Sequence, residues 1–299
     1  MRRILALCIA LCAVFGLEAV SASPAFAWGA SGHSIVAEIG QRRLDRHAAR
    51  EVQKLLGRGH SLASVASWAD DVRTARPGSY NWHFVDIPMA ESAYNAATEC
   101  AANDAGDCVL AELDRLTHEL RCAPNGVERA EALRFAVHFI GDLHQPLHTV
   151  AEARGGNDIA VTVDIHGLTC ARCTPAPNNL HAVWDTTLID RSVYDWGAYV
   201  DRLETGWLLS DEARSAHTGG PLDWALDSHA QAQRIWALTP ADGVLNDAYY
   251  AQAQPILDRQ LGLGGIHLAD YLNAAFAHGC EERGFWSWLW RRRHAPEAH

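Results

Sequence analysis

The sequence lacks three features, each of which would define a class of protein. No apolar run reaches the length of a membrane span. It has no internal repeat and no low-complexity segment, which excludes repeat architectures and biased disordered tracts. It also has few basic residues, since 25 Lys and Arg face 36 Asp and Glu and the net charge is −11. A chain this acidic does not attract polyanions through its overall field, so a phosphate-bearing substrate would have to be drawn by local charge.

The first residues are typical of a secretory signal. A positive n-region (residues 1–3) and an apolar h-region (residues 4–17) precede the Ala-x-Ala site at residues 25–27. We expect cleavage after this site to leave Trp28 as the first residue of a secreted or periplasmic protein. Residues 28–299 would then form one domain, with an aromatic and basic extension at about residues 280–299.

Six cysteines lie beyond this signal: Cys100, Cys108, Cys122, Cys170, Cys173 and Cys280. An even number in an oxidising compartment favours disulfides. Cys170-x-x-Cys173 also fits a zinc knuckle, but no second pair accompanies it. Proximity along the chain favours Cys100–Cys108 and Cys170–Cys173, which leaves Cys122 for Cys280, although the sequence alone does not settle the pairing.

The periodicity of apolar residues predicts a mainly α protein. Helical patterns cover residues 33–56, 62–68, 109–120, 129–143, 181–189, 223–238, 246–261 and 266–277. Loops rich in Gly, Pro, Asn and Asp are expected at 76–81, 101–107, 123–126 and 167–179. Only residues 159–165 alternate in the manner of a strand. We therefore expect a single helical domain with one short β-hairpin or strand pair.

The stretch His138-Phe-Ile-Gly-Asp142-Leu-His-Gln-Pro146-Leu-His148 concentrates residues that bind metals. Because His138 and Asp142 are four residues apart in a predicted helix, they share one face of it. Pro146 ends or kinks that helix, and His148 follows the break. Imidazoles and a carboxylate brought together in this way suit a divalent metal such as zinc. Taken alone, the motif equally fits a buried His–Asp pair with unrelated histidines.

Other segments carry residues of the same kinds: Trp28-Gly-Ala-Ser-Gly-His33, Ala66-Ser-Trp-Ala-Asp70, Trp82-His83-Phe-Val-Asp86 and Leu180-His181-Ala-Val-Trp-Asp185. The last repeats the His-x-x-x-Asp spacing of the central stretch. The first adds a free α-amine and a carbonyl if Trp28 begins the mature chain. Together they offer more ligands than one zinc ion can hold, so the sequence predicts a site for several ions.

With these residues in order, the chain resembles a known family, the zinc-dependent single-strand-specific nucleases and 3′-nucleotidases of fungi, plants and bacteria. The resemblance rests on the motifs WGxxGH, ASWAD, HFVD, HFIGDxxQPLH, GGN and LHxxWD, and it extends to Gly264-Gly265-Ile-His-Leu-Ala. It implies the helical zinc nuclease fold, which is also that of zinc phospholipase C.

The resemblance further implies three zinc ions per chain. The ligands would be Asp70, His83, His138 and Asp142 for the first ion, His148, His181 and Asp185 for the second, and Trp28, His33 and Asp142 for the third. Trp28 would bind through its α-amine and carbonyl oxygen, and Asp142 would bridge two ions. None of these ligands is a cysteine, which suits a site outside the cell.

The same resemblance assigns catalytic roles to Arg73 and Asp70. Arg73 follows Asp70 by about one helical turn and would reach the same cleft, where a guanidinium stabilises the charge that develops on phosphate. The alternative is an exposed arginine that pairs with Asp71 or with nothing.

Three substrate-binding residues also follow from the resemblance. Phe84 would stack on a nucleobase and Asp86 would hydrogen-bond to its edge, which requires an unstacked base and so favours single strands. The alternative for Phe84 is a core residue. Asn157 would contribute to the cleft, unless Gly155-Gly156-Asn157 is only a tight turn.

The function that the resemblance implies is hydrolysis of RNA and single-stranded DNA to 5′-phosphorylated products, with 3′-nucleotidase activity. Its substrates would be single-stranded DNA, RNA and 3′-nucleotides, and we expect a monomer without a stable protein partner. A zinc phospholipase C is one alternative, but that group carries Glu where Asp185 stands here. A zinc-binding or nucleic-acid-binding protein without turnover is another, although binding alone would not need the full ligand set with Arg73.

Two features remain outside this function. Residues 284–294 contain three tryptophans and three arginines, which suit either an accessory binding patch or a helix that closes on the core. His144 is two residues past Asp142 and should point away from the ligand face, so we exclude it from the site; the role of His267 stays open.

Overall fold

The computed structural model of the chain describes residues 28–124 and 126–280. Its α-helices are α1 (Ala30–Arg42), α2 (Arg46–Leu56), α3 (Trp68–Arg73), α4 (Ala96–Glu99), α5 (Val109–Cys122), α6 (Gly126–Leu143), α7 (Ala153–Gly156), α8 (Leu180–Ala182), α9 (Leu188–Ser192), α10 (Trp196–Thr205), α11 (Asp211–Ser215), α12 (Pro221–Leu238) and α13 (Asp247–Ala277). The short 3-10 helices are η1 (Ala63–Val65), η2 (Pro77–His83), η3 (Pro146–Thr149) and η5 (Trp207–Leu209), and η4 (Val183–Thr187) is a π-helical turn. The predicted signal peptide and residues 281–299 of the predicted extension lie outside the described residues. The mainly α, single-domain prediction is confirmed.

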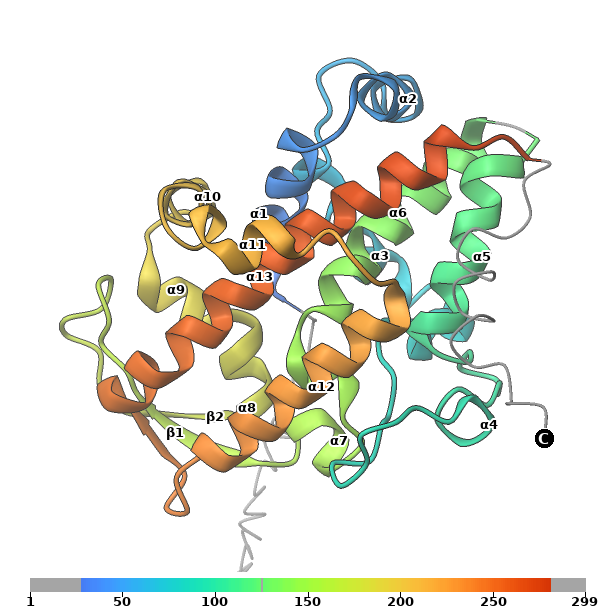
Figure 1. Ribbon diagram of the computed structural model, residues 1–299. Helices are drawn as coiled ribbons and strands as arrows, with labels where there is room; N and C mark the ends of the chain where they lie inside the picture. Colours follow the sequence, from blue (N-terminus) through green and yellow to red (C-terminus); the bar gives the residue numbers. More distant parts are fainter. Residues whose placement is uncertain (1–27, 125, 281–299) are drawn as a thin grey trace, which may run out of the picture.

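Helix α13 crosses the molecule, with the small sheet near its N-terminal end and α2 and α5 near its C-terminal end (Figure 1). It packs closely on α1 because glycines line the contact. A Cβ atom on Gly265 would lie 2.3 Å from Cγ2 of Ile39, and one on Gly40 would lie 2.9 Å from Cδ2 of Leu268. This close approach fixes α1 against the core, and α1 carries His33.

The sheet has three strands in the order β2-β1-β3. Strand β1 (Ala160–Asp164) pairs antiparallel with β2 (Ala176–Asn179), as the prediction of a strand pair expected. Strand β3 (Val244–Asn246) adds a parallel partner that was not predicted. Strand β2 also lies inside a predicted loop, 167–179, and it leads directly into α8, which carries His181.

Several predicted helices have different bounds. The run 33–56 is divided because Asp45 caps α2, where its side chain accepts hydrogen bonds from the amides of His47 and Ala48 at 2.7 and 2.8 Å. The predicted helices 246–261 and 266–277 are one helix, α13, with Pro255 inside it. The predicted loop 76–81 forms most of η2, which ends at His83.

Three disulfides join Cys100 to Cys108, Cys122 to Cys280 and Cys170 to Cys173, which confirms the favoured pairing. The second ties the end of α5 to the residues that follow α13. Among the helices of the described residues, none is both long and apolar enough to cross a membrane.

Candidate metal centre

Helix α6 supplies the centre of the site. His138 and Asp142 lie one turn apart on it, and both side chains are fully buried. Gly141, between them, leaves room for α1, because a Cβ atom there would lie 2.7 Å from Nδ1 of His33. After the helix ends, η3 turns the chain so that His148 also faces inward. The local geometry that the sequence predicted for this stretch is therefore present.

Side chains from distant parts of the chain complete three buried groups. In each group the ligand-type atoms lie within 4.8 Å of one another. The groups are His33, His138 and Asp142; Asp70, His83 and His138; and His148, His181 and Asp185. All eight side chains that the sequence proposed as ligands thus fall into adjoining groups, and His138 belongs to two of them.

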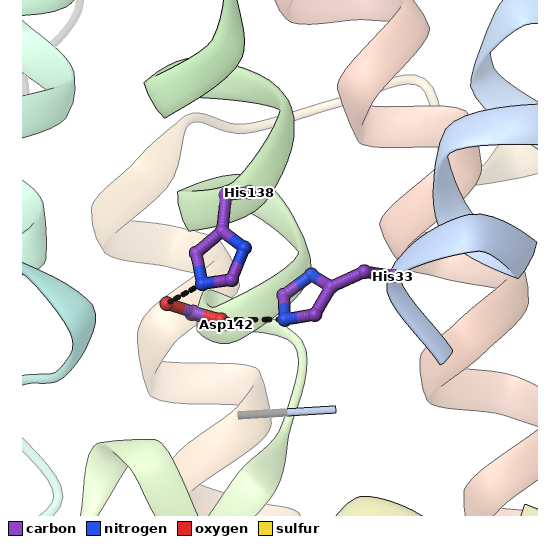
Figure 2. A group of neighbouring side chains, drawn as sticks. All are labelled: His33, His138 and Asp142. Carbon is purple, nitrogen blue, oxygen red and sulfur yellow. Dashed lines mark ion pairs between the residues drawn. The ribbon is translucent and has the colours of Figure 1, made fainter. Parts of the chain in front are cut away.

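Asp142 belongs to the first group and also contacts His83 of the second. One of its oxygens, Oδ1, lies 3.2 Å from Nε2 of His33, and the other, Oδ2, lies 3.3 Å from Nε2 of His138. Figure 2 shows the two imidazoles approaching this carboxylate from α1 and α6. Oδ2 also lies 2.9 Å from Nδ1 of His83. A carboxylate placed in this way can bind one cation with each oxygen.

The backbone fixes which nitrogen of the histidines faces the centre. Nδ1 of His138, His148 and His181 each donates to a carbonyl oxygen at 2.7 Å, from Ala66, His83 and Gly155 respectively. Nε2 of these rings therefore carries a lone pair when the ring is neutral. A carbonyl on the far nitrogen is the usual support of a histidine that binds a metal.

The Nε2 lone pairs of His148 and His181 point at one another. Nε2 of His181 lies 3.1 Å from Nε2 of His148, a contact that needs a proton or a cation between the two nitrogens. Among the described residues, Oδ1 of Asp70, Oδ2 of Asp185 and Nε2 of His83 are buried without a hydrogen-bond partner. Buried polar atoms seldom stay unsatisfied, so the donor set fits divalent metal ions.

In the group of His148, His181 and Asp185, burial keeps the two imidazoles neutral and makes the carboxylate costly to ionise. It lowers the pKa of His181 to about 4 and that of His148 well below its ordinary value. It raises the pKa of Asp185 well above the usual range, although a hydrogen bond from Gln145 opposes the shift. Neutral imidazoles are the form that binds metals, and a bound cation would favour the ionised carboxylate.

Arg73 lies where the sequence placed it, at the end of α3 and one turn from Asp70. Burial is the main cause that lowers the pKa values of His83, His148 and His181, and the positive charge of Arg73 adds to this effect, which indicates that the guanidinium lies near two of the groups. Its Nη2 donates to the backbone oxygen of Tyr80 at 3.1 Å, and its Cζ lies 4.0 Å from the centre of the Tyr80 ring. Sequence reasoning missed this partner, because nothing in a single tyrosine indicates it.

Phe84 and Asp86 lie on one side of an extended segment whose other side is core. Val85 and Ile87 are fully buried, Phe84 is half-buried and Asp86 is exposed. The amide of Val85 donates to the carbonyl of His148 at 2.9 Å, which holds the segment against η3. Alternation along the strand therefore presents both predicted substrate residues to the same side.

The Gly155-Gly156-Asn157 segment is a turn, and it also supports the site. The carbonyl of Gly155 accepts the hydrogen bond from His181 described above. The side-chain amide of Asn157 donates to the carbonyl of Arg154 at 2.9 Å, so in this structure Asn157 holds the turn together. Its predicted place in the cleft stays a prediction.

Trp28 is fully buried at the edge of the site. The amide of the next residue, Gly29, donates to the carbonyl of Asp185 at 2.8 Å, which brings the start of the described chain beside a predicted ligand. The predicted cleavage before Trp28 involves residues outside the described part, so its α-amine stays a prediction.

Two neighbours of the predicted ligands behave differently from them. His144 points away from the groups and lies 2.7 Å from His267, as its exclusion from the site predicted. Gln145 was not predicted to matter, yet its amide donates to Oδ1 of Asp185 at 2.6 Å and it is fully buried. A glutamine carries no metal-ligand signal, so sequence reasoning could find this contact only through the fold.

A helical protein that buries adjoining groups of imidazoles and carboxylates beside an arginine is of the class built to hold several metal ions. Comparison with known proteins makes the assignment specific, since the sequence model of the family described as S1/P1 nuclease matches residues 28–277. The chain belongs to this family, and it is a hydrolase of phosphodiester bonds.

Its relatives are fungal and plant enzymes. Nuclease PA3 from a Penicillium species is 33% identical over 285 residues, which cover 85% of this chain and 99% of the relative. Nuclease P1 from Penicillium citrinum has the same identity and coverage. Endonuclease 2 from Arabidopsis thaliana is 32% identical over 275 residues, which cover 83% of this chain and 90% of the relative.

Proposed function

We propose that the protein is a secreted or periplasmic trinuclear zinc phosphodiesterase that hydrolyses RNA and single-stranded DNA to 5′-phosphorylated products and also removes phosphate from 3′-nucleotides. The observation that carries this proposal is the set of three adjoining buried groups, in which imidazole lone pairs face one another and carboxylate oxygens lack hydrogen bonds among the described residues.

The ligand sets of the proposal follow these groups. One ion would be held by Asp70, His83, His138 and Asp142, a second by His148, His181 and Asp185, and a third by His33, Asp142 and the α-amine and carbonyl of Trp28. Nitrogen-rich sets with carboxylates and without thiolates suit zinc better than magnesium or calcium. When bound, zinc ions would supply Lewis-acid charge at the phosphate and lower the pKa of a water molecule.

The chain's own residues supply the remaining chemistry. Arg73 is oriented by the Tyr80 carbonyl and lies near two of the groups, so its guanidinium would bind the phosphate and stabilise the charge that develops on it. Asp70 is nearly buried one helical turn away. It would bind a metal ion, and its negative charge would help to orient the Arg73 guanidinium.

The Phe84 and Asp86 side of the extended segment would bind the base. Phe84 is partly exposed, so the exposed part of its ring would be available for stacking. Asp86 lies two residues on along the same side and would accept hydrogen bonds from the base edge. Stacking of this kind needs an unpaired, unstacked base, which supports preference for single strands.

The localisation and oligomeric state are part of the proposal. Three disulfides and a site without cysteine ligands suit an oxidising compartment. Each group draws its ligands from one chain, so no second copy is needed to complete the site and a monomer suffices.

The test compares four substrates, RNA, single-stranded DNA, 3′-AMP and phosphatidylcholine, on the chain that begins at Trp28, after loading with zinc. We expect hydrolysis of RNA, single-stranded DNA and 3′-AMP, with loss of activity on treatment with a chelator and recovery on addition of zinc. Hydrolysis of phosphatidylcholine instead would identify a phospholipase C. Binding of zinc and oligonucleotide without any turnover would identify a non-catalytic protein and refute the proposal.

A further inference from the structure

The four residues of α7 (Ala153–Gly156), beside the candidate site, have left-handed backbone conformations and so form a turn rather than a regular right-handed helix. The φ angles are 47° for Ala153, 52° for Arg154, 64° for Gly155 and 83° for Gly156. Glycine adopts this region readily, but alanine and arginine do so at a cost. Within the described residues, these are the only residues other than glycine with positive φ. Such strain is concentrated at functional sites, where the surrounding structure imposes it.

Packing against the site imposes the turn. The Gly155 carbonyl accepts from His181, and a Cβ atom on Gly155 would lie only 2.4 Å from the carbonyl oxygen of Leu147. The chain just before the turn also runs beside the Phe84–Asp86 segment, since the Ala151 amide donates to the Ile87 carbonyl at 3.1 Å. The turn therefore places Arg154 at the rim of the site, next to the proposed base-binding side.

The Arg154 side chain faces solvent at this rim. It is 74% exposed, and its guanidinium pairs with the exposed carboxylate of Asp158 at 2.6 Å. This hydrogen bond is the main cause that raises the pKa of Arg154, followed by the charge of Asp158, with a further contribution from Tyr80. Tyr80 approaches the same rim because its ring contacts the ring of Phe84, and its contribution to the pKa of Arg154 agrees with this placement.

Tyr80 is an aromatic residue that lies largely in solvent. It is 50% exposed, whereas most large apolar side chains of the described residues are buried. Its ring covers the Arg73 guanidinium and meets the Phe84 ring edge to face, with ring centres 6.2 Å apart. The rim thus presents the Tyr80 ring, which covers the Arg73 guanidinium, together with the exposed guanidinium of Arg154.

We propose that Tyr80 and Arg154 form a subsite for the nucleotide that adjoins the scissile phosphate, in which Arg154 pairs with that nucleotide's phosphate and Tyr80 stacks on its base. A cation beside a stacking ring is how proteins bind single strands without reading sequence. The subsite rests on the proposed nuclease function and extends it from one nucleotide to a strand. It also supplies local positive charge on a chain whose net charge is −11.

The pair with Asp158 does not prevent this role. Exposed ion pairs contribute little to stability, so a phosphate can replace the carboxylate at small cost. When no phosphate is bound, the hydrogen bonds to Asp158 hold the Arg154 guanidinium above the turn.

The strain itself provides the sharpest test. Arg154→Gly removes both the strain and the charge, whereas Ala153→Gly removes the strain at the preceding residue and leaves the charge. Each variant should raise Tm by about 2 °C. Only Arg154→Gly should raise KM for a longer oligonucleotide, by about fivefold to tenfold at low salt. It should also reduce the slope of log KM against log salt concentration by about 0.7, the value for one lost phosphate contact on a single strand.

A dinucleotide provides the internal control, because it contains the scissile phosphate but no adjoining one. KM for a dinucleotide should be unchanged in both glycine variants. Tyr80→Phe should behave as the wild type, and Tyr80→Ala should raise KM for the longer oligonucleotide. Asp158→Asn removes the competing carboxylate, so it should leave that KM unchanged or lower it.

The outcomes separate this inference from the proposed function. If the wild type hydrolyses neither substrate, the proposed function fails. If it hydrolyses both, while Arg154→Gly keeps the wild-type KM and salt dependence on the longer oligonucleotide, the function stands and the subsite is wrong. A fall in Tm for Arg154→Gly with unchanged KM would mean that Arg154 only stabilises its turn.

Discussion

Gly155 offers a direct way to disturb the candidate metal centre without replacing a predicted ligand. Its carbonyl orients His181 through the 2.7 Å hydrogen bond from Nδ1. In Gly155→Ala, the new Cβ atom would lie 2.4 Å from the carbonyl oxygen of Leu147 and 3.2 Å from Nδ1 of His181. Since neither neighbour is the flexible end of a long side chain, the turn must move and the carbonyl must move with it.

The expected cost has two parts. A side chain at φ 64° costs about 1 kcal/mol, and the overpacking adds about 1–3 kcal/mol. Loss of the carbonyl that orients a histidine ligand lowers metal affinity by about 10-fold to 100-fold. Gly156→Ala is the matched control, because its φ of 83° gives the same backbone strain while its nearest contacts, at 3.5 Å, are ordinary.

The assay is a chelator titration of the zinc-loaded protein, combined with thermal unfolding of the metal-free protein. We expect Gly155→Ala to lose one zinc ion at lower chelator concentration than the wild type, with a parallel loss of RNA hydrolysis. Gly156→Ala should show a modest fall in Tm with wild-type metal retention. Equal metal retention in the two variants would refute the view that the Gly155 carbonyl holds His181 in its binding orientation.

Three further predictions address individual roles. Asp142→Asn keeps the size of the side chain but loses the charge shared between two groups, so zinc content and activity should fall together; normal zinc content would exclude a bridging role. Arg73→Ala should preserve the zinc content and lower kcat by about 10²–10³. Phe84→Ala should instead mainly raise KM. Small, equal effects of the two substitutions would mean that the substrate lies elsewhere. A chain with one glycine added before Trp28 has an amide in place of the α-amine, so it should bind one zinc ion fewer and lose most hydrolysis; full zinc content and activity would show that Trp28 is only a core residue.

The sequence predicted which side chains gather in the buried groups, because their geometry is local or depends on short motifs. The spacing of His138 and Asp142 fixes their shared face in any helix, and the break at Pro146 brings the next imidazole inward. Nε2 of His181 lies 3.4 Å from Oδ2 of Asp185, although their helical segment contains a π-helical turn. Residues four apart therefore stay neighbours in this segment.

The supporting contacts were missed because they join residues far apart in the sequence. Gln145 reaches Asp185 across 40 residues, and Gly155 holds His181 with a backbone oxygen, which has no side-chain signature. Tyr80 sits in a segment predicted as a loop, so its approach to Arg73 depends on the 3-10 helix that forms there.

Two features of the fold were predicted wrongly, one because of a cluster of glycines and the other because a strand is very short. The cluster of glycines at residues 262–265 reads as a helix break, but in α13 it permits close packing, since a Cβ atom on Gly262 would lie 2.4 Å from the Trp207 ring. Strand β3 has three residues and pairs with β1 from the far side of the sequence, so it is too short to show alternation.

The proposal that the three buried groups hold zinc ions can be tested by a crystal structure of the chain that begins at Trp28, with anomalous diffraction measured on both sides of the zinc absorption edge. We expect three zinc peaks, one in each of the proposed ligand sets, with Asp142 in contact with two of them. A single peak, or peaks outside the groups formed by these side chains, would refute a trinuclear zinc centre.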